Sequence, residues 1–255
     1  MAGQTADGGL NHTALDPALP RSPWAVPGGV PLGLRALTHP WYPERRSRPP
    51  GDTGALVGEL GLVSGWQLRR LLRCRAPDLP GRLVRAGVLT AHVVEGPVRL
   101  PRLYGTALMH AMPPWDGLAA VKQAAANQFL VQFLDLGPAH GAAFRADWGP
   151  GLTVVRGADR FTVAAFREGR DEEQRFEAFL DGYRPGSGKA VVVAATVGHM
   201  VRLSGLARVR TCPLRLTWDG ALFHLPLARA FCRVGGDGPV PVLMSGLGAD
   251  EGRGK

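Results

Sequence analysis

The sequence has few cysteines and no long apolar run. Its cysteines are odd in number, form no CxxC pair and lack the Cys/His spacing of a metal site: Cys74, Cys212 and Cys232. This pattern argues against a structural zinc site and predicts a reducing compartment. No stretch approaches the roughly 18 apolar residues of a membrane-spanning helix, and no basic start leads into an apolar run of signal-peptide length. We therefore expect a cytoplasmic protein without a membrane segment.

Lysine is also scarce, although the chain is strongly basic. The formal net charge is +9 at pH 7, yet only three of the 30 basic residues are lysines: Lys122, Lys189 and Lys255. A charge of this size indicates an anionic partner, either nucleic acid or a membrane surface, and says nothing about the fold. Arginine makes forked contacts to phosphate and to guanine, but a genomic composition bias produces the same ratio.

Composition divides the chain into five parts, and together they predict an α+β protein. Residues 1–52 are rich in glycine and proline, and because prolines cannot donate backbone hydrogen bonds, we expect a mostly disordered arm. Residues 53–112 are predicted to form a small helical domain with a hairpin, and residues 113–137 a connecting helix. An α/β domain is expected over residues 138–234, and a flexible glycine-rich tail over residues 235–255.

The small domain is predicted from its helix signals. Ser64 and Gln67 have the spacing of a capping box at the start of a second helix. Pro77 suits the first turn of a third helix, and Gly87 suits its C-terminal cap. The β-rich residues that follow predict a hairpin with its tip at Glu95 to Pro97. Three helices and a hairpin are the order of a winged helix-turn-helix.

Specific residues in this domain carry a resemblance to a known family. They are Val63, Gln67, Leu68, Leu71, Arg82, Leu83, Ala86, Gly87, Val88, Leu89, Tyr104 and Thr106. The segment resembles the winged helix-turn-helix domain of prokaryotic regulators and of the replication-relaxation family of plasmids and mobile elements. The resemblance implies binding to double-stranded DNA, in transcription regulation or in a replication-relaxation-like role.

Arginines are concentrated in the same segment. Residues 64–102 contain a local excess of positive charge, with only Asp78 and Glu95 as acids. The candidate DNA-binding residues are Arg69, Arg70, Arg73, Arg75, Arg82, Arg85, Arg99 and Arg102. In a winged helix the third helix enters the major groove, the second lies over the backbone and the wing reaches phosphates or the minor groove. We therefore expect Arg82 and Arg85 to read bases and Arg99 to contact DNA from the wing. The phosphate contacts are expected from Arg69, Arg70, Arg73 and Arg75.

The connecting segment has apolar residues around most of its helical circumference. A helix of this kind must be buried, so residues 113–136 are predicted either to lie between domains and mediate a homodimer or to be an ordinary core helix. In the α/β domain, short strand-like segments precede an amphipathic helix that Asp171 would cap. A buried strand at KAVVVAATVG, a helix at HMVRLSGLARV and closing strands at CPLRLTW and GALFHLPL complete the prediction.

No catalytic or metal site is expected in this domain, and no cofactor. The family resemblance implies a nuclease-like α/β domain, but the strand that would carry its charged pair reads FTVAAF, with Ala164 and Ala165 in the relevant positions. A degenerate, non-cutting domain is therefore predicted. Two alternatives remain open. One is a metal-dependent nuclease that uses Asp147, Asp159 and Glu168, and the other is a protein-interaction module that uses the wing.

Overall fold

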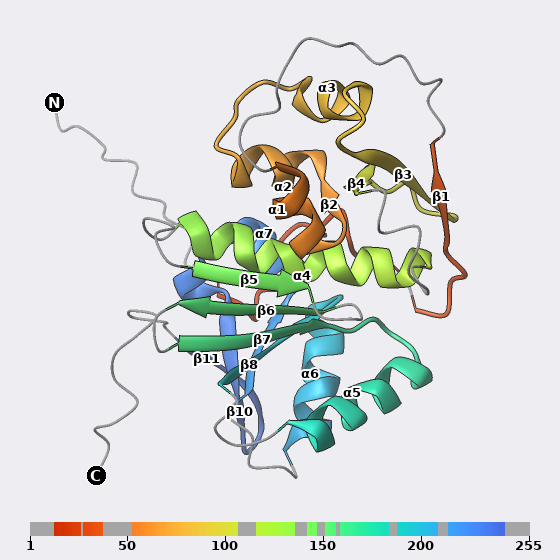
Figure 1. Cartoon of the computed structure of the whole chain (residues 1–255). Helices are drawn as coiled ribbons and strands as arrows, with labels where there is room; N and C mark the ends of the chain where they lie inside the picture. The colour runs from red at the N-terminus through yellow and green to blue at the C-terminus, as the bar shows by residue number, and fades with distance from the viewer. Residues whose placement is uncertain are drawn as a thin grey trace, which may run out of the picture.

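A computed structural model describes residues 13–26, 28–37, 53–106, 116–135, 142–146, 151–156, 159–183, 188–208 and 214–242. Within these ranges the protein is α+β, with seven α-helices and two sheets. Figure 1 shows two units on either side of the long helix α4 (Gly117–Asp135), with the first unit above it and the larger sheet below.

The first unit contains three helices and a small antiparallel sheet of order β1-β3-β4-β2. Its helices are α1 (Thr53–Leu60), α2 (Gly65–Leu71) and α3 (Leu79–Arg85). Its strands are β1 (Gly33–Ala36), β2 (Val63–Ser64), β3 (Thr90–Glu95) and β4 (Leu103–Gly105). The predicted three helices and hairpin over residues 53–106 are therefore present.

Local signals at the helix ends explain these boundaries. The capping box is confirmed, since the Ser64 hydroxyl accepts from the Gln67 amide and the Gln67 side chain accepts from the Ser64 amide. Gly87 follows α3 with φ +71°, the left-handed conformation that glycine adopts at little cost. The prediction that Pro77 opens α3 is wrong by two residues, because the helix begins at Leu79 and places Pro80 in its first turn.

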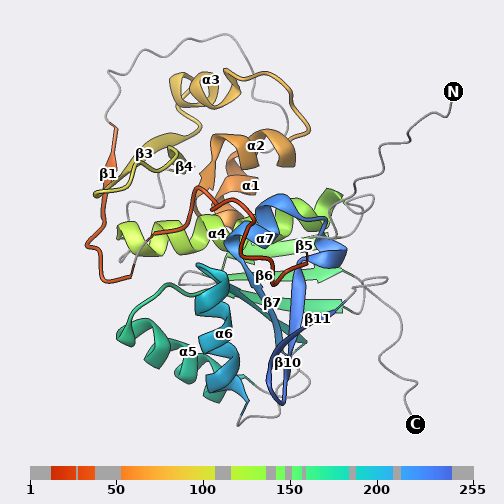
Figure 2. The same cartoon turned by 180° about the vertical axis from the view of Figure 1, so that it is seen from behind.

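The N-terminal segment is ordered in its described part, which corrects the prediction of a disordered arm for residues 13–26 and 28–37. Strand β1 pairs with β3 over four residues, and Trp24 is buried. The Trp218 indole donates to the Ala14 carbonyl at 2.7 Å. Figure 2 shows this segment in red, crossing α4 and α7 before it reaches β1. Prolines exclude a helix, but an extended chain still docks through its apolar side chains. The rest of residues 1–52 is outside the described ranges.

The second unit is built on a seven-stranded sheet of order β11-β10-β9-β8-β7-β6-β5. Its strands are β5 (Ala142–Ala146), β6 (Gly151–Arg156), β7 (Asp159–Ala165), β8 (Lys189–Ala194), β9 (Leu214–Trp218), β10 (Phe231–Gly235) and β11 (Gly238–Val242). The centre, β7-β8-β9, is parallel, and the other pairs are antiparallel. Helices α5 (Arg170–Gly182) and α6 (Val197–Ala207) connect the parallel strands on the face opposite α4 (Figure 1).

Three predictions for this unit are wrong in detail. The segment predicted as the closing strand GALFHLPL instead forms α7 (Asp219–His224) and a 3₁₀ turn (Leu227–Arg229), because a short apolar run does not distinguish strand from helix. Helix α5 is preceded by Gly169 at φ +136°, so Asp171 lies in the first turn and does not cap it. Part of the predicted flexible tail is the edge strand β11, paired with β10.

Helix α4 is buried within a single copy of the chain. From Gly117 to Phe133 no residue of the helix is fully exposed, because the helix packs on β6 and β7 on one side and on α2 and α7 on others. The predicted burial is confirmed, and because the chain itself covers the described helix, its burial gives no support to the predicted homodimer through residues 113–136. Within the described ranges, none of the helices has the length and hydropathy needed to cross a membrane.

We predict that Gly117→Ala lowers the free energy of unfolding by about 1 to 3 kcal/mol. A Cβ at this position would lie 2.6 Å from the Gly33 carbonyl oxygen and 2.6 Å from the Leu32 Cβ, so the N-terminal segment would have to move. The control is Gly205→Ala on α6, where a Cβ meets no atom within 4 Å and helix propensity rises. Urea unfolding measures both. Equal stability of Gly117→Ala and the wild type would show that the segment is not docked there.

Candidate nucleic-acid interface

The eight arginines predicted from the sequence all lie on the surface of the first unit. Seven are exposed and Arg69 is half-buried. They occupy α2, the α2–α3 loop, α3 and the β3–β4 loop, and in that order they are Arg69 and Arg70, Arg73 and Arg75, Arg82 and Arg85, and Arg99 and Arg102. We call these residues the arginine cluster.

Both acids of this segment have basic partners. The Asp78 carboxylate is 3.5 Å from the Arg82 guanidinium, one turn along α3, and both side chains are about half exposed. Glu95 forms an ion pair with Arg35 of β1, an arginine outside the segment that was counted from the sequence. The two acids neutralise only two of the nine arginines counted with Arg35, so the surface keeps a large excess of positive charge.

Arg73 has an unusual backbone. Helices α2 and α3 end in the same way, with paired backbone bonds across the last turn: Cys74 N to Arg69 O at 2.9 Å in α2, and Val88 N to Leu83 O at 3.0 Å in α3. The left-handed residue after α3 is Gly87, whereas after α2 it is Arg73, at φ +50°. A side chain in this conformation costs roughly 1 kcal/mol. The sequence therefore retains an arginine where glycine would be more stable.

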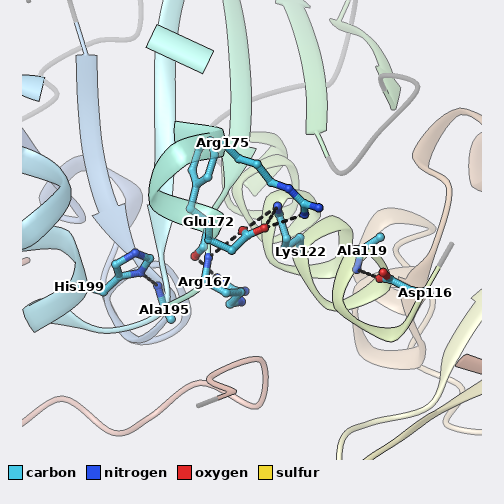
Figure 3. Close-up of polar contacts among 9 residues, drawn as sticks. Asp116, Ala119, Lys122, Arg167, Glu172, Arg175, Ala195 and His199 are labelled. Atoms are coloured by element: carbon cyan, nitrogen blue, oxygen red, sulfur yellow. Dashed lines mark hydrogen bonds and ion pairs between the residues drawn. The ribbon is translucent and has the colours of Figure 1, made fainter. Parts of the chain in front are cut away.

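A second polar cluster lies at the carboxyl ends of the parallel strands, where α/β proteins commonly bind ligands. Its centre is an ion pair between Lys122 of α4 and Glu172 of α5, 2.7 Å apart and almost fully buried (Figure 3). The Glu172 carboxylate also accepts from the Arg167 amide and from the Arg175 guanidinium. Burial opposes its charge, but these partners outweigh burial and hold the pKa of Glu172 below its ordinary value.

Arg167 and Asp219 form a neighbouring buried pair. One guanidinium nitrogen is 3.0 Å from the Asp219 carboxylate, and another donates to the Phe166 carbonyl. Burial of the carboxyl raises the pKa of Asp219 to about 6, although Arg167 acts in the opposite direction. The pair joins the end of β7 to the start of α7.

The third carboxylate of the region, Glu168, accepts from the Thr196 hydroxyl at 2.9 Å, and Arg202 lies 3.7 Å away. His199, buried on α6, accepts from the Ala195 amide through Nδ1. Burial, with help from Arg202 and Arg167, lowers the pKa of His199 to about 4, so the ring is neutral near pH 7. Its Nε2 has no hydrogen-bond partner within the described ranges.

All three carboxylates of this region are engaged by neighbouring side chains. Glu168, Glu172 and Asp219 each have a cationic or hydroxyl partner, and no group of three His, Cys, Asp or Glu residues within the described ranges is placed to hold a metal ion. Ala164 and Ala165, where a nuclease would carry charges, are buried in β7. For the alternative nuclease reading, Asp147 and the side chain of Asp159 are outside the described residues.

The buried cluster was not predicted from the sequence, although one signal pointed to it. Lys122 is a lone basic residue in an apolar helix, and a charge in that position requires a buried partner of opposite sign. No comparable signal identifies Arg167 and Asp219, which are 52 residues apart along the chain.

We predict that His199→Asn reduces the loss of stability on acidification. The pKa of His199 is about 4 in the folded chain against 6.5 ordinarily, so its contribution is present above pH 6.5 and is lost as pH falls toward 4. Between pH 7 and about pH 4.5 the wild type should lose about 2 to 3 kcal/mol more than the variant. Asp219 acts in the opposite direction, because protonation of its carboxyl stabilises the fold as pH falls through about 6. This effect is the same in the wild type and in the variant, so it cancels in the comparison.

Urea unfolding at the two pH values gives the comparison. Asparagine keeps an acceptor for the Ala195 amide but does not titrate, so the variant removes the charge without removing the bond. The same pH dependence in both proteins would contradict the assignment of this acid sensitivity to His199.

Comparison with known proteins adds no assignment to this geometry: no family model, no curated protein and no solved structure matches the chain.

Proposed function

We propose that the protein binds double-stranded DNA through the arginine cluster of its first unit. The observation that carries the proposal is the cluster itself, eight surface arginines on two short helices and the loops beside them. Such a surface neutralises phosphates and releases counterions, which supplies sequence-independent affinity for duplex DNA. Both acids of the segment are already engaged by arginines, so they do not repel the phosphate backbone strongly.

The order of the elements supports a winged helix as the DNA-binding fold. From α1 to β4 the chain runs helix, strand, helix, helix, strand, strand, and the short β2 pairs with β4 beside the β3–β4 hairpin. This is the order of winged helix-turn-helix domains. In that arrangement α3 enters the major groove, and the β3–β4 loop is the wing.

The roles of the arginines follow from this docking. Arg82 and Arg85 on α3 face bases, while the arginines of α2 and the α2–α3 loop contact phosphates, and Arg99 contacts DNA from the wing. The Arg82–Asp78 pair does not prevent this, since a half-exposed pair of this kind is worth at most about 1 kcal/mol and yields to a phosphate.

The second unit acts as a non-catalytic partner of the first, in a transcriptional regulator or a replication-relaxation-like factor. Its core order of helix, three strands, helix and strand, from α4 to β8, is compatible with a nuclease-like ancestry. The buried alanines of β7 and the paired carboxylates at the strand ends favour a domain that has lost cutting activity and retains a structural role.

We predict that Arg82→Ala/Arg85→Ala weakens duplex binding at least about tenfold, because each base-edge contact contributes roughly 1 to 3 kcal/mol. The control is Arg208→Ala/Arg233→Ala, which removes the same charge from exposed positions of the second unit and should change affinity less than about twofold. Fluorescence anisotropy with a labelled duplex at several salt concentrations measures both. Equal losses in the two double variants, or no binding even at low salt, would contradict the proposal.

We also predict that Arg73→Gly has opposite effects on stability and on binding. Glycine relieves the left-handed strain and should raise the free energy of unfolding by about 1 kcal/mol, while loss of the charge weakens DNA binding a few-fold. Arg73→Lys keeps both the charge and the strain and serves as the control. A glycine variant that is more stable and binds DNA as well as the wild type would remove Arg73 from the interface.

A further inference from the structure

A cavity of about 410 Å³ opens beside the arginine cluster. Its four aromatic side chains come from four parts of the chain: Trp24 from the N-terminal segment, Trp66 from α2, Tyr104 from β4 and Phe223 from α7. Prolines make up much of the remaining wall. Its volume is within the range of sites that hold small organic molecules.

The wall of the cavity is aromatic and its rim is cationic. Trp66 is more than a third exposed, although its ring packs against Phe223 with centroids 5.4 Å apart. Arg69 and Arg102 line the same cavity, and none of the described residues that line it is acidic. A planar ring that carries negative charge matches this combination, because it stacks on the aromatic face while the arginines bind its anionic group.

A third cation lies beside the aromatic wall. The Arg70 guanidinium lies over the Trp66 ring, 5.8 Å from its centroid, which adds positive charge next to that ring.

We propose that this cavity binds one unpaired nucleotide, with its base on Trp66 and its phosphate at Arg69 and Arg102. The inference rests on the proposed DNA binding, since Arg69 and Arg102 belong to the arginine cluster. A base inside a duplex is stacked and paired and cannot enter, so the occupant is a nucleotide at a strand end or in a single-stranded stretch. The protein then recognises a junction between duplex and single strand, with the duplex on α3 and the first unpaired base in the cavity.

The test compares a blunt duplex with the same duplex carrying a short unpaired extension, using the full chain. A 2-aminopurine at the first unpaired position reports stacking through its fluorescence. Stacking of one base on an aromatic ring predicts about tenfold tighter binding of the extended DNA, with quenching of the probe. Trp66→Leu should remove both effects, whereas Trp66→Phe, which keeps a ring, should retain them. Val201→Ala, at an exposed apolar position on α6, is the control and should behave as the wild type.

The outcomes separate this inference from the proposed function. Equal affinity of the wild type for the two DNAs overturns the cavity assignment and leaves duplex binding in place. A preference for the extended DNA that survives in Trp66→Leu has the same consequence. If neither DNA binds, the proposed function fails, and thymidine monophosphate alone becomes the probe. Calorimetric binding of the free nucleotide to the wild type, lost in Trp66→Leu, would support a nucleotide site without DNA. Absence of any heat of binding with the wild type would overturn the nucleotide site.

Discussion

The buried amide side chains of α4 hold the two units together, and the rest of the structure depends on them. Asn127 donates to the carbonyls of Leu60 and Leu62, at the end of α1 and just before β2, at 3.0 and 2.8 Å. On the other side, Gln123 accepts from the Gly151 amide, at the start of β6. Gln123 and Asn127 also bond to each other at 3.0 Å. A chain of hydrogen bonds therefore runs from the first unit through α4 to the large sheet.

Gln67 couples this network to the fold of the first unit. Its side-chain oxygen completes the capping box of α2, and its nitrogen donates to the Ala124 carbonyl of α4 at 2.7 Å. A buried amide that lost its partners would cost about 1 to 3 kcal/mol for each unsatisfied group. The start of α2 and the position of the first unit on α4 are thus fixed by the same side chain, so α2 and its arginines have a set orientation relative to the sheet.

How much of this the sequence predicts depends on how local each signal is. Neighbouring residues determine the capping box, the glycine after α3 and the short strands at the start of the second unit. These features were therefore predicted. The docked N-terminal segment was missed, since its proline content hides the burial of Trp24 against distant parts of the chain. The dimer prediction stays without support for a related reason. The apolar circumference of α4 was read correctly, but the sequence does not say that the chain itself covers it.

The same distinction applies to the candidate site. The arginine cluster is a property of one segment, so the sequence alone located it, and the surface positions of its members follow from their charge. The cavity beside it is formed by residues between position 23 and position 223, and no spacing or motif links Trp24, Trp66 and Phe223. Because α4 fixes the first unit against the second, these distant residues are held as one wall. The aromatic wall therefore keeps a fixed position relative to the arginines of α2.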